Sequence, residues 1–110
     1  MGHLLSSAIK MQSLAAATAT IEINNLGSLD TCAWVKNGVS QGSVTTSVTA
    51  TLTAGDTFLV SASNSSIGAT IDYYLNGTYV TSYFDAFAAE TPTITSSADN
   101  AYKFDCFGGA

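Results

Sequence analysis

The chain has 110 residues, of which 46% are hydrophobic and 10% charged, and its formal net charge at pH 7 is -5. This length suits one domain with a single small core, and a chain with three basic residues, all of them Lys, lacks the basic clusters that bind nucleic acid. No apolar run reaches the roughly 18 to 20 residues that cross a bilayer. We therefore expect one ordered domain with no nucleic-acid partner and no membrane span.

Residues 1–17 differ from the rest of the chain and are expected to form an N-terminal arm. Their larger apolar side chains have a loose helical spacing that an extended arm fits equally well: Leu4, Leu5, Ile9, Met11 and Leu14. Full burial of these side chains would yield about 7 to 15 kcal/mol, whereas ordering about 16 residues costs about 16 to 30 kcal/mol of backbone entropy. The arm is therefore expected to need neighbouring chains for its order.

The same segment makes a poor secretion signal, because Lys10 interrupts the stretch where an apolar region belongs. We expect a chain that is already mature, or one exported without a cleaved leader.

From residue 18 onward the dominant pattern has a period of two residues, as in "SVTTSVTATLTA", residues 43–54. Strands are predicted near residues 18–24, 31–36, 43–53, 57–63, 69–75, 78–84, 91–96 and 101–107. Short strands with frequent turn residues predict an all-β fold over residues 18–110, an antiparallel β-sandwich of about 7 to 8 strands, Ig-like or jelly-roll-like.

The stretch "YYLNGTYV", residues 73–80, predicts a two-residue type I′ hairpin, because Asn-Gly between alternating segments favours that turn. An unbroken register turns Val80 and Phe84 toward the core. The same register places three tyrosines on the outer face: Tyr74, Tyr79 and Tyr83. Two interpretations stay open, since an opposed aromatic pair stiffens a hairpin and also offers a contact surface.

The two cysteines are both expected to point inward, because Cys32 shares a strand face with Trp34, and Cys106 shares one with Tyr102 and Phe104. A disulfide between them would be worth about 4 to 5 kcal/mol. Two buried free thiols that behave as small apolar groups are the alternative. The sequence leaves both open.

Candidate catalytic and metal-binding groups are sparse. The one His is His3, within the arm, so a Ser-His-Asp or Cys-His arrangement would take its base from the least constrained part of the chain. The acidic residues lack the spacing of a calcium loop, and two cysteines with one distant His do not make a zinc site. We expect no enzymatic activity, no metal and no cofactor.

The segment "AIKMQSLAAATATIEI", residues 8–23, resembles the beginning of small tailed-phage virion structural proteins. In addition, "LTAGDTFLVSAS", residues 52–63, resembles β-sandwich repeats of phage and bacterial surface proteins. The resemblance implies a non-enzymatic virion subunit, such as a head decoration, cement, tail or fibre component. Its arm would reach a neighbouring copy or another virion subunit, by strand addition to an exposed sheet edge.

Two further hypotheses remain. The first is a secreted filament or pilus subunit, outside the cell or on its surface, whose arm is donated to the next subunit. The second is a carbohydrate-binding module in which Tyr74, Tyr79 and Tyr83 stack on a surface glycan and Asp72 is the polar anchor.

Overall fold

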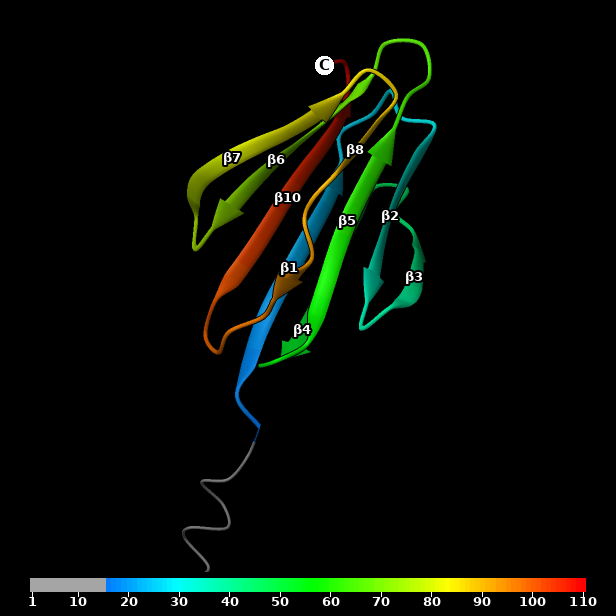
Figure 1. Ribbon diagram of the computed structural model, residues 1–110. Coiled ribbons are helices and arrows are strands. Elements are labelled where there is room, and N and C mark those ends of the chain that lie inside the picture. The colour runs from blue at the N-terminus through cyan, green and yellow to red at the C-terminus, as the bar shows by residue number, and fades with distance from the viewer. Residues whose placement is uncertain (1–15) are drawn as a thin grey trace, which may run out of the picture.

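The computed structural model describes residues 16–110, which form two five-stranded sheets packed face to face (Figure 1). One sheet contains, in spatial order, β4 (Ser47–Thr53), β1 (Thr18–Asn25), β10 (Ala101–Gly108), β6 (Ala69–Leu75) and β7 (Thr78–Asp85). The other contains β3 (Val39–Ser43), β2 (Thr31–Lys36), β5 (Thr57–Ser63) and β8 (Ala88–Glu90), with β9 (Ile94–Thr95) also paired to β5. The predicted all-β sandwich is confirmed. Its strand pairs are antiparallel apart from β1 and β10, which run parallel.

The core lies between the sheets and is centred on aromatic rings that cross from one sheet to the other. Phe58 on β5 meets the rings of Tyr102 and Phe104 edge-on, with centroid distances of 5.1 and 5.8 Å. Tyr73 on β6 stacks on Phe104 at 4.9 Å. Such pairs add about 0.5 to 1.5 kcal/mol each beyond the burial of their area. These ring contacts therefore join the two sheets across the core.

The predicted strand over residues 43–53 is wrong in its first part. Strand β3 ends at Ser43 in one sheet and β4 begins at Ser47 in the other, so the chain changes sheets between them. Val44 is buried at this crossing. The sequence did not predict β3 because all of its residues are exposed and it has no apolar alternation.

The predicted strand over residues 91–96 is replaced by the short strands β8 and β9. Between them, the buried Thr91 bonds to the backbone of Val60: its Oγ1 accepts a hydrogen bond from the Val60 N–H at 2.9 Å. The Thr91 N–H also donates to the Val60 carbonyl at 2.9 Å, so the hydroxyl and the backbone of Thr91 together continue the pairing with β5 between the two short strands.

The Asn-Gly hairpin is confirmed, since Asn76 and Gly77 both have positive φ, 51° and 81°, as a type I′ turn requires. Tyr74 pairs with Tyr79 as predicted. The register then shifts, because Tyr73 faces Thr81 and leaves Val80 as the extra residue of a β-bulge.

This bulge reverses the two faces of β7 beyond Val80, as a one-residue slip does in any sheet. Tyr83 lies opposite Ile71 and packs against the core. Phe84 lies opposite Thr70 and is exposed. The predictions that Tyr83 shares the outer face and that Val80 and Phe84 face the core are therefore wrong.

Candidate functional site

The first end of the sandwich is the one at which strand β1 begins. The Ala54 N–H donates to the Ala17 carbonyl at 2.9 Å, and the Asp99 N–H donates to the Thr18 carbonyl at 2.6 Å. We call these four residues the entry end, the lower end in Figure 1. Residues 1–15 join the described chain here. The predicted arm contacts lie outside the described residues: Leu4, Leu5, Ile9, Met11 and Leu14.

At the opposite end, hydrogen bonds tie three loops and the end of β10 together. The Asn64 N–H donates to the Phe87 carbonyl at 3.0 Å, which joins the loop after β5 to the loop after β7. The N–H groups of Gly108 and Gly109 donate to the carbonyls of Gly27 and Gly68, at 3.0 and 2.9 Å. Segments distant in the sequence thus form one continuous surface.

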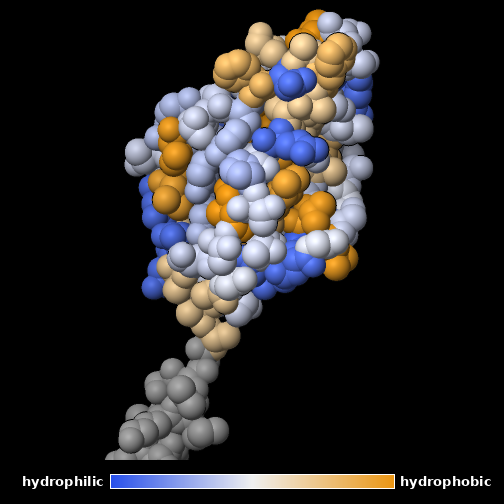
Figure 2. All heavy atoms as spheres, in the orientation of Figure 1, coloured by the Kyte–Doolittle hydropathy of each residue, from blue (hydrophilic) through white to orange (hydrophobic). Residues whose placement is uncertain are grey.

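Large apolar side chains are exposed on this surface. Leu26, Ile67, Phe84 and Phe87 are 62%, 54%, 68% and 67% exposed, and we call them the apolar end. Figure 2 shows hydrophobic residues gathered at the upper end of the molecule. Large exposed apolar side chains gathered at one end of a domain mark an interaction surface more often than scattered single residues do.

Strand β7 borders the apolar end and is an edge of its sheet. Within residues 16–110 it pairs with β6 alone, so none of these residues bonds to the other side of its backbone. The strand contains no Lys, Arg or Pro, and its one edge-protecting feature is the bulge at Val80, which lies before Phe84. An open hollow of about 420 Å³ separates β7 from β8 of the other sheet and is lined by Phe84, Ala88 and Glu90 among others. An added strand has both a backbone partner and space here.

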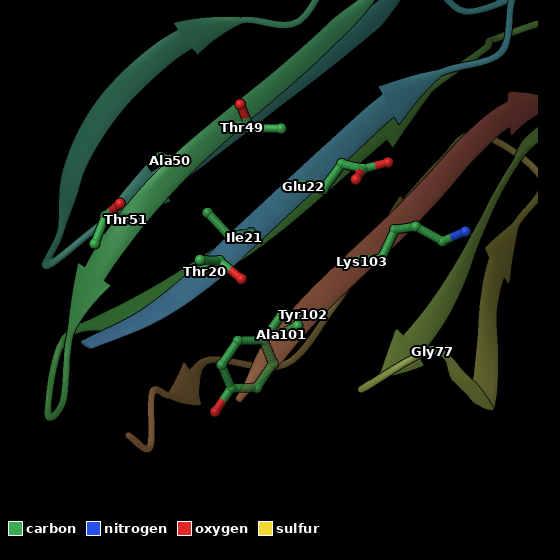
Figure 3. Close-up of a pocket in the computed structure, with 10 residues that line it drawn as sticks. All are labelled: Thr20, Ile21, Glu22, Thr49, Ala50, Thr51, Gly77, Ala101, Tyr102 and Lys103. Atoms are coloured by element: carbon green, nitrogen blue, oxygen red, sulfur yellow. The ribbon is translucent and has the colours of Figure 1, made fainter. Parts of the chain in front are cut away.

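A shallow groove of about 600 Å³ crosses the outer face of β4, β1 and β10 (Figure 3). Hydroxyls from Thr20 and Thr51 line it together with Glu22 and Lys103, which come from neighbouring strands. Gly77 of the hairpin forms part of its rim.

The charged groups in and beside this groove are partnered within the sheet. The Asn24 amide donates to Glu22 at 2.8 Å and to Asp105 at 2.9 Å. Lys103 Nζ lies 3.9 Å from Asp105 Oδ2, a part-exposed ion pair of the kind that contributes about 0 to 1 kcal/mol. The groove is therefore a satisfied polar sheet face.

The structure brings Tyr74 and Tyr79 together, and it places Tyr83 on the other side of β7. The Tyr74 and Tyr79 rings meet edge-on, 5.8 Å apart at 70°, and Lys103 Nζ covers the Tyr74 ring at 4.5 Å. The pair therefore presents no single flat platform for a sugar ring.

Asp72, the polar anchor of the carbohydrate hypothesis, accepts a hydrogen bond from the Ser82 hydroxyl at 2.6 Å. Glycan binding stays a prediction. Titration of glycans against Tyr74→Ala and Tyr79→Ala variants tests it, and unchanged affinity assigns these rings to the hairpin.

Within residues 16–110, no group of three or more His, Cys, Asp or Glu side chains is placed to hold a metal ion, and no helix is long and apolar enough to span a membrane. His3, the one candidate base, lies outside the described residues. Hydrogen bonds from Asn37 and from the Thr53 backbone lower the pKa of Asp56, and those from the Phe87 and Ala88 backbones lower the pKa of Asp85. Both aspartates thus act as turn-stabilising acceptors.

No family model matches this chain, and no curated protein matches it. Among solved structures, the fold is similar to that of a mutant form of the major pilin from Streptococcus pyogenes, with a TM-score of 0.47 and 10% sequence identity. A second structure of the major pilin from Streptococcus pyogenes gives a TM-score of 0.40 and 11% identity. Each alignment covers 86% of this chain and 49% of the pilin chain. This chain therefore spans about half the length of the pilin chains it matches.

Sequence reasoning did not name Leu26, Ile67 or Phe87, and it placed Phe84 on the core side. Leu26, Ile67 and Phe87 lie in three different loops and Phe84 lies within β7, so no single periodic pattern contains them. The signal that was present is an apolar residue beside Gly or in a short polar loop, as in Leu26-Gly27 and Ile67-Gly68.

Proposed function

We propose that this chain is a non-enzymatic structural subunit whose copies join head to tail into an extracellular or cell-surface filament. The observation that carries the proposal is the polarity of the sandwich. Residues 1–15 join the domain at the entry end, and the apolar end, where β7 finishes, lies at the opposite end. When unlike surfaces of one molecule pair, the contact repeats from copy to copy and grows an open filament unless the rotation closes it.

In this joint, residues 1–15 of one copy add a strand to β7 of the next. Backbone hydrogen bonds to the free side of β7 satisfy the arm's own polar groups, whatever its side chains. The apolar residues of the arm then cover Phe84 and Phe87, which gives the contact a hydrophobic component: Leu4, Leu5, Ile9, Met11 and Leu14. The partner is thus a second copy of the same chain.

The alternative is a virion subunit, which would use the same joint in a closed shell or a tail. Electron microscopy of the purified native material distinguishes a filament subunit from a virion subunit. Open-ended filaments support the filament, and shells or tailed particles support the role implied by the resemblance of residues 8–23 to phage virion proteins.

Removal of residues 1–15 tests the arm directly. We expect the shortened chain to be monomeric at concentrations where the full chain assembles, with an unchanged thermal unfolding midpoint, because the core uses residues 19–106. The matched control is Lys10→Ala, which changes the arm but keeps its apolar residues. Normal assembly of the shortened chain would show that the arm is not the joint.

A further inference from the structure

The two cysteines of the chain belong to different sheets and meet in the core. Cys32 lies on β2 and is 3% exposed, and Cys106 lies on β10 and is fully buried. Each occupies the inward face of its strand, as the sequence predicts. Both are free thiols in the structure.

A short run of hydrogen bonds fixes the backbones of these two residues relative to each other. The Val44 N–H donates to the Cys32 carbonyl at 2.7 Å, and the Asn25 side-chain amide donates to the Val44 carbonyl at 3.0 Å. Asn25 is the β1 residue that pairs with Cys106, and the Leu26 N–H donates to the Cys106 carbonyl at 2.7 Å. Two residues therefore connect the cysteines across the sandwich.

The side chains complete this arrangement. The two thiols are hydrogen-bonded to each other, which lowers the pKa of Cys32. The same contact, together with burial, raises the pKa of Cys106. The two thiols thus face each other within one core cluster, on strands whose backbones are already held together.

We propose that Cys32 and Cys106 are an oxidation site, which becomes a disulfide between the two sheets when the chain folds in the presence of a disulfide donor. The Cys32 thiolate attacks one sulfur of the donor, the donor's other sulfur leaves as a thiolate, and a mixed disulfide forms. The Cys106 thiolate then displaces the remaining donor sulfur. In total the protein loses two protons and two electrons, and the donor disulfide is reduced to two thiols.

Burial determines when this step occurs. A donor molecule does not reach sulfurs that are 3% and 0% exposed, so the exchange takes place while the chain folds. Once closed, the bond is shielded from reductants for the same reason. The proposal is independent of the head-to-tail joint, because both cysteines lie inside one subunit.

The test uses the full chain, refolded from denaturant either with oxidised glutathione or with a reductant. Free thiols are then blocked with N-ethylmaleimide in denaturant and the intact mass is measured. We expect the oxidatively refolded monomer to take up no maleimide and to be about 2 Da lighter than the unblocked reduced chain. Its melting temperature should exceed that of the reduced form by roughly 15 to 30 °C, because the bond closes a long loop.

Cys32→Ala and Cys106→Ala are the matched controls. Each should take up one maleimide and melt at the same temperature after either refolding. The mass measurement on the unaltered chain decides the question even where a variant does not fold. Two maleimides per chain after oxidative refolding, or disulfides only between chains, would overturn the proposal.

Discussion

Replacing Phe84 and Phe87 with Ser removes the two most exposed large side chains of the apolar end, and we expect it to weaken assembly without affecting the fold. Both rings are about two thirds exposed, at 68% and 67%. The substitutions therefore remove no core contact. Exposed substitutions of this kind change stability by about 0.5 kcal/mol or less.

The size of the effect on assembly follows from the exposed area. Full burial of a Phe side chain yields about 1.5 to 3 kcal/mol, so covering the exposed two thirds yields about 1 to 2 kcal/mol per ring. The double variant loses about 2 to 4 kcal/mol of association free energy, which raises the dissociation constant by about 30- to 1000-fold.

Sedimentation velocity over a dilution series measures this shift, and thermal unfolding checks the fold. The control is Val39→Ser, because Val39 is 62% exposed and follows the turn at Asn37, whose N–H and side-chain amide bond to Thr57 and Asp56 near the entry end. We expect Val39→Ser to assemble normally. An equal loss of assembly in both variants would show that general surface hydrophobicity, and not the apolar end, drives association.

Three other substitutions test the stability of the fold. Gly68→Ala should destabilise the fold by about 1 to 3 kcal/mol more than Gly77→Ala, because both glycines have positive φ but a Cβ at Gly68, unlike one at Gly77, would meet a backbone oxygen at 2.7 Å. Equal denaturant midpoints for the two variants would contradict this. Thr91→Val should cost about 1 to 3 kcal/mol in denaturation, because it leaves the buried Val60 N–H without its side-chain acceptor; a neutral result would mean that the hydroxyl is dispensable. The pKa of Asp56 is lower in the folded chain than its unfolded value of about 4, so the ionised carboxylate stabilises the fold above that pH. The loss of stability in Asp56→Ala should therefore be full at pH 7 and should shrink as the pH falls through the lowered folded-state pKa. A loss that is constant with pH would refute this.

The sequence predicted the sandwich well where one side of a strand is buried. Strand β1 buries every second residue from Ala19 to Ile23, and β5 does the same from Phe58 to Ala62, so period two was sufficient there. Strand β3 was not predicted, because it is held by pairing with β2 and none of its side chains is buried. A strand whose stability comes only from its neighbour leaves no hydrophobic pattern to find.

The apolar end could not be predicted from the two-residue alternation of the sequence. One bulged residue, Val80, sends Phe84 outward and Tyr83 inward, and nothing in the alternation marks that residue. Leu26, Ile67 and Phe87 lie at the same end because backbone hydrogen bonds join the loops that contain them or adjoin them. The candidate surface thus depends on how distant segments are brought together, whereas the core strands can be found from the local alternation of apolar residues.

The most direct measurement of the head-to-tail account mixes two defective subunits. The chain without residues 1–15 keeps only the β7 acceptor, and the full chain with Phe84→Ser and Phe87→Ser keeps the donor arm beside an acceptor weakened about 30- to 1000-fold. At concentrations between the dissociation constants of the intact and the weakened joint, each alone should remain monomeric by sedimentation velocity. Their mixture should form one-to-one dimers that grow no further. Failure of the mixture to associate, or its growth into long assemblies, would contradict a joint made by the arm of one copy and the apolar end of the next.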